Sequence, residues 1–210
     1  MSRVITLLKK LPVDVGQAEK KHDTAGKRIA FSFVPIVPAP AGAAPAKEKT
    51  ALDIGCRDGY WSERLKEKGY RVSALDIKPS YAGAMTHDAE DGLPYADHSF
   101  DLVWCTEVVE HLQKPESLFS EIDRVLRSGG IAILTTPNSS WWFYSVVRLW
   151  GWTPQKLQNP DHKQFFDEKK IRMLARGWRV LGYFPYAFFF FPIRRLIGLL
   201  SPTFVMVKRF

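Results

Sequence analysis

Residues 51–59 read Ala-Leu-Asp-Ile-Gly-Cys-Arg-Asp-Gly, and residues 74–77 read Ala-Leu-Asp-Ile. This pattern predicts a strand, a glycine turn, a helix from residue 60, and a second strand that ends in Asp76. Glycines in such a turn let the backbone approach a ligand closely, and an acid at the tip of the next strand can hold a ribose. The stretch therefore predicts half of an α/β fold that binds a nucleoside.

The spacing of the glycines bears on which nucleoside-containing ligand fits this turn. A dinucleotide fingerprint needs G-x-G-x-x-G, because a pyrophosphate must lie against the start of the helix. Here Arg57 stands between Gly55 and Gly59 where the middle glycine would be, and the third glycine is missing. The turn therefore favours a ligand without a pyrophosphate and argues against a nicotinamide-dependent oxidoreductase.

Length, charge and cysteine content restrict the class of protein. The chain has 210 residues, which suffices for one α/β domain with extensions. Its net charge of +8 favours nucleic acid, anionic lipid or an acidic small molecule as partner, although a basic surface can also serve solubility alone. Cys56 and Cys105 make no zinc site or disulfide framework, which predicts a reducing cytoplasm. The apolar run at residues 4–8 is too short for a signal peptide, and no segment reaches the length of a transmembrane helix.

Composition divides the chain into an N-terminal extension, residues 1–49, and a core domain, residues 50–210. Residues 1–30 predict one or two short polar helices, and residues 31–49 predict a Pro/Ala-rich linker or strap. The strands predicted for the core lie at residues 50–55, 70–77, around 87–90, 100–106, 131–136, 178–184 and 204–210. The predicted helices lie at residues 60–68, 107–112, 115–126 and 167–176. Strands that alternate with helices indicate a parallel sheet with right-handed crossovers.

Five motifs follow one another along this core: the acidic glycine loop at 53–59, Asp76, Asp88-Ala89, the segment 93–101, and the turn at 126–130. In this order they resemble the motifs of the class I S-adenosylmethionine (SAM)-dependent methyltransferases, of the type 11 and ubiquinone-biosynthesis O-methyltransferase kind. The resemblance implies a three-layer, Rossmann-like α/β fold. Its seven-stranded, mostly parallel sheet would have the order 3-2-1-4-5-7-6, with the seventh strand antiparallel.

The resemblance also implies SAM as the cofactor, which is a sulfonium with an amino-acid tail and no phosphate. Asp76 would bind the ribose diol, and Ile77 with Asp88 would supply the apolar wall and the acceptor that adenine needs. The residues expected to bind SAM are Asp53, Gly55, Cys56, Gly59, Asp76, Ile77, Asp88, Ala89 and Cys105. Arg57 is expected to face outward or to brace the turn.

Glu107, Glu110 and His111 follow the fourth predicted strand at positions i, i+3 and i+4, which share one face of a helix. Two carboxylates and an imidazole suit Mg²⁺ or another divalent cation, and His162 could reach the same cleft. The set is similar to that of ubiquinone-biosynthesis O-methyltransferases and of small-RNA 3′-terminal 2′-O-methyltransferases, whose acceptors present two vicinal oxygens. Without a metal, Glu107 would only cap the helix, and His111 or His162 would be the general base.

Residues 185–202 predict an aromatic, apolar insertion that includes Arg194-Arg195. Pro185 and Pro192 limit long regular structure, and residues 193–200 predict a short helix with arginines beside an apolar face. Such a segment suits an anionic membrane surface, a lid over a lipid-like substrate, or packing on the edge of the sheet. The aromatic residues 141–144 predict either a wall of the substrate pocket or a core helix.

These features predict a SAM-dependent methyltransferase that acts on a hydroxyl group, in preference to nitrogen or carbon, of a small, lipid-linked or polyprenylated acceptor. An RNA ribose 2′-O-methyltransferase is the second interpretation. The net charge supports it, but the basic residues are scattered and no separate RNA-binding module is visible, so nucleic acid is the less favoured partner. A third interpretation is an inactive SAM-fold scaffold at a membrane. The expected location is the cytoplasm, with peripheral binding to the inner face of the membrane.

Overall fold

The structure of the chain is a computed structural model that describes residues 24–38, 48–186 and 189–210. Its centre is a sheet of eight strands in the order β3-β2-β1-β4-β5-β8-β6-β7. The strands are β1 (Thr50–Ile54), β2 (Arg71–Asp76), β3 (Met85–Thr86), β4 (Phe100–Thr106), β5 (Leu126–Pro137), β6 (Arg179–Tyr186), β7 (Phe189–Ile193) and β8 (Thr203–Arg209). The first five pair in parallel, whereas β8 is antiparallel to β5 and to β6, and β7 is antiparallel to β6.

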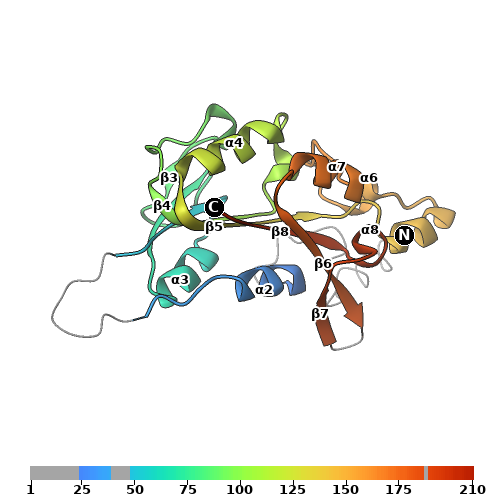
Figure 1. The fold of residues 1–210 in the computed structure, drawn as a ribbon. Coiled ribbons are helices and arrows are strands. Elements are labelled where there is room, and N and C mark those ends of the chain that lie inside the picture. The colour runs from blue at the N-terminus through green and yellow to red at the C-terminus, as the bar shows by residue number, and fades with distance from the viewer. Residues whose placement is uncertain (1–23, 39–47, 187–188) are drawn as a thin grey trace.

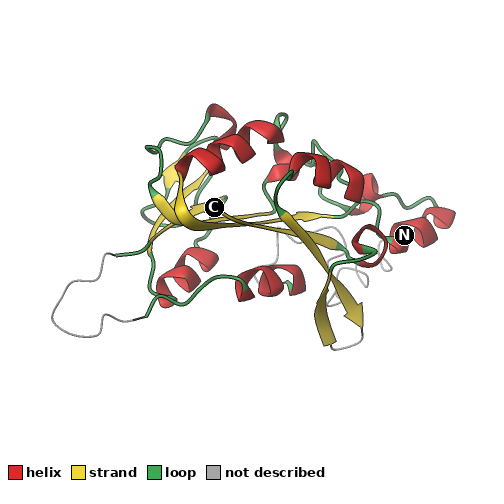
Figure 2. Ribbon diagram, viewed as in Figure 1, coloured by secondary structure: helices red, strands yellow, loops and turns green. Residues whose placement is uncertain are grey.

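Helices cover both faces of the sheet, so the fold has three layers (Figures 1 and 2). One face carries α4 and α7, and the other carries α2 and α3 (Figure 1). The helices are α2 (Ala25–Ser32), α3 (Tyr60–Glu67), α4 (Pro115–Val125), α5 (Trp142–Val147), α6 (Pro154–Leu157), α7 (Glu168–Leu174) and α8 (Ile197–Leu200), and the 3-10 turns are η2 (Ala89–Asp91), η3 (Val109–His111) and η4 (Arg148–Trp150). No helix among the described residues is long and apolar enough to cross a membrane.

Each face of the sheet has its own hydrophobic core. On the α4 face, Leu118 and Ile122 lie four residues apart on the helix and pack toward the sheet. On the opposite face, Phe31 of α2 and Trp61 of α3 pack against Trp104 of β4, with the centroids of the Phe31 and Trp61 rings 4.9 Å apart. All five residues of β1 are buried, as a parallel strand covered on both faces requires.

The implied strand order is confirmed for the core, with the antiparallel β8 between β5 and β6. The structure adds one strand to the seven expected, because the segment predicted as an aromatic, apolar insertion contains β7 at the edge of the sheet. The short helix expected at residues 193–200 is α8, which begins only at Ile197.

Other boundaries differ from the prediction because backbone groups find partners far along the chain. β5 begins at Leu126, since the segment 126–130, which was predicted to be a turn, continues as a bulge in which Gly129 N donates to Phe210 O at 2.8 Å. The third strand lies at Met85–Thr86, before the residues expected. The helix predicted at 107–112 is wrong: Glu107 has a φ of 59° and donates its N–H to Thr135 O at 3.0 Å, so that only the turn η3 follows.

The described part of residues 1–49 packs on the sheet. Thr24 caps α2 by accepting the Lys27 N–H at 3.3 Å, and Phe31 and Val34 belong to the core. Lys68 after α3 donates through Nζ to Val34 O at 2.6 Å, which ties the segment after α2 to the core. The remainder of the predicted extension, residues 1–23 and 39–47, lies outside the described residues.

Candidate functional site

A cavity of about 510 Å³ opens at the carboxyl ends of β1, β2 and β4. In parallel α/β sheets, ligands bind in a crevice at this edge, where the strand order reverses direction. Most of the residues that line it come from the ends of these strands and from the turns after β1, β2, β3 and β4, and they include Ile54, Gly55, Cys56, Arg57, Leu75, Asp76, Ile77, Asp88, Ala89, Glu90, Thr106, Glu107, Val108, His111 and Leu112.

The glycine turn is built on left-handed backbone and on Asp76. Gly55 has a φ of +77°, and a Cβ atom there would come within 2.4 Å of Val108 Cγ2. Arg57 also adopts a positive φ of 52°, and its N–H donates to Asp76 Oδ2 at 2.9 Å. Asp76 Oδ1 accepts the Lys78 N–H at 2.8 Å. Arg57 therefore braces the turn through its backbone, and the Asp76 carboxylate keeps further lone pairs for a ligand.

The second wall of the cavity is an apolar surface with one carboxylate. Ile77, 59% exposed, and Leu75 line the cavity, as does the buried Ala89. Asp88 caps η2 by accepting the Glu90 N–H at 2.9 Å, which holds its side chain beside Ala89. This pairing of a flat apolar wall with a fixed acceptor suits a purine ring.

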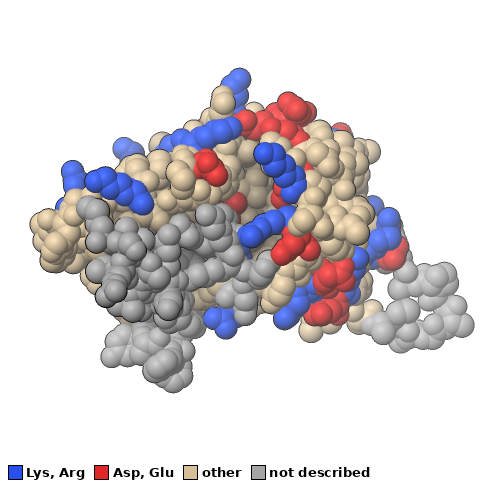
Figure 3. All heavy atoms as spheres, turned by 180° about the vertical axis from the view of Figure 1, so that it is seen from behind, with Lys and Arg blue, Asp and Glu red and all other residues tan. Residues whose placement is uncertain are grey.

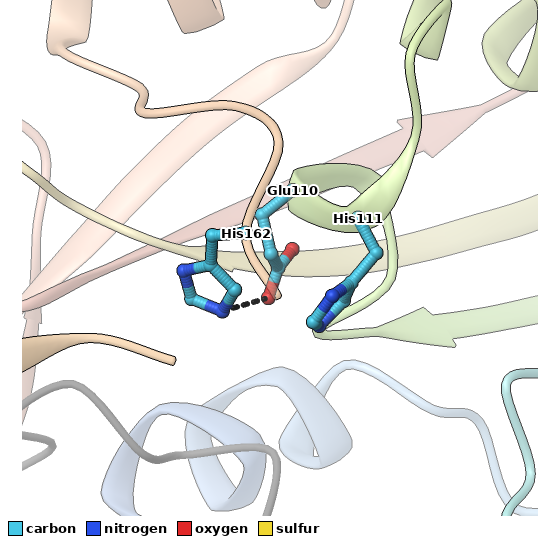
Figure 4. Close-up of side chains that lie close together, drawn as sticks. All are labelled: Glu110, His111 and His162. Carbon is cyan, nitrogen blue, oxygen red and sulfur yellow. Dashed lines mark ion pairs between the residues drawn. The ribbon is translucent and has the colours of Figure 1, made fainter. Parts of the chain in front are cut away.

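The side chains of Glu110, His111 and His162 lie close together (Figure 4). His111 lines the cavity, and its Nδ1 lies 3.3 Å from the carbonyl oxygen of Asp161. A carbonyl can only accept, so Nδ1 carries the proton in the neutral ring and Nε2 carries the lone pair. The rings of His111 and His162 meet edge to face with centroids 4.8 Å apart.

His162 and Glu110 are both buried. The His162 Nε2 lies 4.0 Å from Glu110 Oε1, and Thr136 Oγ1 donates to Glu110 Oε2 at 2.9 Å. Burial, together with the neighbouring His111, lowers the pKa of His162 to about 4, against a smaller opposing effect of Asp161. His162 is therefore neutral at pH 7, and its contact with Glu110 is not a salt bridge there.

The expected metal ligands come together only in part. One ligand atom from each of Glu110, His111 and His162 lies within 4.8 Å of the others, but Glu107 is not in this group. Because residues 107–112 do not form the predicted helix, the side chain of Glu107 does not lie on a common helix face with those of Glu110 and His111. Its carboxylate instead accepts from Thr135 Oγ1 at 2.7 Å, and Glu107 lines the cavity.

Comparisons with known proteins identify this arrangement. Residues 52–134 match the family described as the methyltransferase domain. The chain contains a methyltransferase domain over this range. The ubiquinone biosynthesis O-methyltransferase of Caulobacter vibrioides is 28% identical over 172 residues, 73% of this chain and 68% of the relative. Two proteins of the same name are similar: that of Methylobacterium sp. is 31% identical over 68% of this chain and 64% of the relative, and that of Idiomarina loihiensis is 29% identical over 59% of this chain and 58% of the relative.

Solved structures show the same fold. A SAM-dependent methyltransferase from Thermotoga maritima superposes with a TM-score of 0.63 and 16% identity, over 88% of this chain and 87% of that one. Another from Mesorhizobium loti has a TM-score of 0.61 and 16% identity, over 89% of this chain and 98% of that one.

The cavity of this methyltransferase fits SAM. Close packing of Val108 on Gly55 makes the turn a backbone cradle that a side chain would fill, and Asp76 offers acceptors to a ribose diol. Of the residues expected to bind SAM, six line the cavity: Gly55, Cys56, Asp76, Ile77, Asp88 and Ala89. Cys56 lies there as a protonated thiol, because burial and nearby carboxylates raise its pKa to about 12.

Three of the residues expected to bind SAM are absent from the cavity lining. Asp53 is buried beneath the turn, where it accepts from Ser62 Oγ at 2.6 Å. Gly59 has a φ of +81° at the start of α3 and packs beneath the ring of Tyr81. Cys105 is buried in the core of the sheet, where burial raises the pKa of its thiol.

Two cationic residues of the methyltransferase cavity could not be found from the sequence. Lys27 of α2 is 5% exposed and lines the cavity, although its segment was assigned to an extension. Lys163 also lines the cavity, and its Nζ lies 3.5 Å from Glu90 Oε2. The only local signal is that Lys27 stands on a helix face with the apolar Ala30 and Phe31.

Proposed function

We propose that this methyltransferase transfers the methyl group of SAM to a hydroxyl group of a small, lipid-linked acceptor. The observation that carries the proposal is His111, which lines the cavity and whose Nδ1 lies 3.3 Å from the carbonyl oxygen of Asp161, so that Nε2 keeps the lone pair. A hydroxyl is a poor nucleophile unless its proton is removed as it reacts. A neutral imidazole can take up that proton on its unprotonated ring nitrogen.

The surrounding residues would hold His111 and the acceptor in place. When bound, SAM supplies an electrophilic methyl group on a positively charged sulfur. The carbonyl of Asp161 fixes the tautomer of His111, so that the proton released by the hydroxyl goes to Nε2. Val108 and Leu112 provide apolar surface on the same wall, which suits the body of an aromatic or lipid-like acceptor. The names of the relatives, ubiquinone biosynthesis O-methyltransferases, support oxygen as the methylated atom.

The experiment measures transfer of labelled methyl from SAM to a lipid extract, to a short-chain polyprenyl catechol, and to small RNA. His111→Gln is expected to lower kcat at least about 100-fold while the affinity for S-adenosylhomocysteine stays within about twofold, since loss of a general base costs roughly this much. His98→Asn is the control, because His98 lies in a turn with a φ of 52° that Asn tolerates. Labelling of RNA alone, or equal turnover by His111→Gln and the unaltered protein, would overturn the proposal.

A divalent cation is a second candidate for the same group. The ligand atoms of Glu110, His111 and His162 lie within 4.8 Å of one another, and carboxylate and imidazole ligands suit Mg²⁺, Mn²⁺ or zinc. A cation there would lower the pKa of an acceptor hydroxyl and orient it.

Calorimetric titration of the chelator-treated protein with Mn²⁺ and Zn²⁺ distinguishes this candidate from the metal-free base. Binding that Glu110→Gln abolishes, together with activity that chelator removes and metal restores, supports the cation. Full activity in chelator rejects it and leaves His111 as the base.

A further inference from the structure

The outer face of α5 and η4 carries a stripe of large apolar side chains. Trp142, Val146, Leu149 and Trp150 are 43%, 41%, 82% and 66% exposed. Their spacing of four, three and one places them along one side of a helix. Single exposed apolar residues are ordinary on a protein surface, whereas a contiguous group marks a binding surface.

The residues of a small core beneath α5 lie on the side of the helix away from this stripe. The opposite side of α5 already packs inward through Trp141, Tyr144 and Val147, which form a small core with Leu157 of α6. Trp141 stacks on Phe143 with ring centroids 4.9 Å apart. The helix is therefore held in place by one apolar side and presents a second apolar side to solvent.

Two further exposed apolar side chains lie at the neighbouring helix α8. Ser140 Oγ donates to Gly198 O at 3.1 Å, and Asn138 Nδ2 donates to the same oxygen at 2.8 Å, so the start of α5 lies against α8. Leu196 and Leu199 are 64% and 50% exposed there. The six exposed side chains, Trp142, Val146, Leu149, Trp150, Leu196 and Leu199, are called the apolar end below.

The charges around the apolar end are basic. Arg148, Lys156, Arg194 and Arg195 are exposed on the same segments. The sequence has no Asp or Glu between Asp123 and Asp161, and none after Glu168. The Glu168 carboxylate is already engaged by the Gly198 N–H at 2.8 Å and by Arg172 at 2.8 Å. Figure 3 shows blue Lys and Arg atoms among tan ones at this end of the molecule, on the left.

We propose that the apolar end docks on the surface of an anionic lipid bilayer, with Leu149 and Trp150 inserted between the headgroups. The α5–η4 segment projects from one end of the molecule (Figure 1), as a surface that inserts into a lipid layer must. Tryptophan and leucine beside arginine and lysine are the composition of interfacial segments, whose cations are attracted to anionic headgroups. This surface lies apart from the residues of the cavity and would operate whatever the acceptor is.

Flotation with vesicles tests the proposal on the full chain without SAM. The protein is expected to float with phosphatidylglycerol-containing vesicles at low salt, and less at high salt, because exposed charges are screened. Leu149→Ser with Trp150→Ser should lower the partition coefficient at least about tenfold, since two apolar side chains leave the lipid. Both side chains are mostly exposed, so the variant should keep its melting temperature.

Met173→Ser is the matched control, because Met173 on α7 is 61% exposed and lies outside the apolar end. It should float as the unaltered protein does. Equal flotation of the Leu149/Trp150 variant and the control would overturn the proposal. So would a lack of flotation at low salt, or a dimer in light scattering that this variant alone loses, which would assign the surface to a second copy of the chain.

Discussion

The hydroxyl of Ser62 donates to Oδ2 of Asp53 at 2.6 Å, and both side chains are buried beneath the glycine turn. Burial raises the pKa of Asp53 to about 7, and nearby Asp76 adds to this effect, against the smaller opposing effects of Ser62 and Lys27. Asp53 therefore takes up its proton in the folded state near neutral pH, far above its ordinary pKa of 3.8. This relationship makes the stability of the site dependent on pH.

Asp53→Asn should remove that pH dependence. The folded pKa lies above the unfolded one, so the contribution of Asp53 to stability is fully present below pH 3.8 and is lost as the pH rises through about 7. The loss is about 4 kcal/mol at most, from 1.36 kcal/mol for each pH unit of the shift. Asparagine keeps an acceptor for Ser62 and never ionises. Urea unfolding at pH 5 and pH 8 should show a smaller decrease in free energy for the variant than for the unaltered protein, and an equal decrease would contradict this account.

Gly55→Ala should destabilise the fold and weaken cofactor binding, because its Cβ would lie 2.4 Å from Val108 Cγ2 and its φ is +77°. Gly151→Ala is the control for the backbone alone, since its φ is +74° and nothing lies within 4 Å of the added atom. The left-handed backbone costs each variant about 1–2 kcal/mol. Thermal melts should show a larger loss for Gly55→Ala. Equal losses in the two variants would mean that the contact with Val108 relaxes freely.

Asp76→Asn should lower the affinity for S-adenosylhomocysteine about tenfold or more, because the amide has one oxygen where the carboxylate has two acceptors for the Arg57 and Lys78 N–H groups and the ligand. Isothermal calorimetry measures this directly. Asp91→Asn, at an exposed position in the neighbouring turn η2, should leave the affinity unchanged. A retained affinity in Asp76→Asn would exclude the carboxylate as a ligand contact.

The Lys163–Glu90 ion pair joins the loop after α6 to the turn that carries Asp88, and both residues line the cavity. Lys163→Glu should speed the release of S-adenosylhomocysteine in stopped-flow measurements by about threefold to tenfold, because like charges would push the two walls apart. The exchange of both charges, Lys163→Glu with Glu90→Lys, should restore the slower rate. If the double variant releases the ligand as fast as the single one, the pair does not hold the walls together.

Local sequence patterns predicted much of this structure. The glycine turn and Asp76 were predictable because the ends of β1 and β2 are adjacent in a parallel sheet. The Arg57 N–H can therefore donate to the carboxylate of Asp76, nineteen residues later in the chain. The buried run of β1 and the apolar spacing of α4 likewise identify their elements without knowledge of any contact.

The site itself depended on contacts between distant residues. The spacing of Glu107, Glu110 and His111 suggested a helix, but β5 offers Thr135 O to the Glu107 N–H, and that bond replaces the helical one. The alignment of His162 with Glu110 requires the loop after α6 to cross the strand ends, where Lys163 N donates to Glu110 O at 2.9 Å.

The sequence by itself therefore determined most strands of the core and the nucleoside-binding turn, because hydrophobic period and turn chemistry act between near neighbours in the chain, whereas the strand order was implied only by the resemblance to known methyltransferases. Only the tertiary structure decided that Lys27 lines the cavity and that Glu107 lies outside the group formed by Glu110 and the two histidines. It also decided that Leu149 and Trp150 stay exposed. Those outcomes depend on which backbone groups and apolar faces remain unsatisfied once the sheet has formed, and that is a property of packing rather than of spacing.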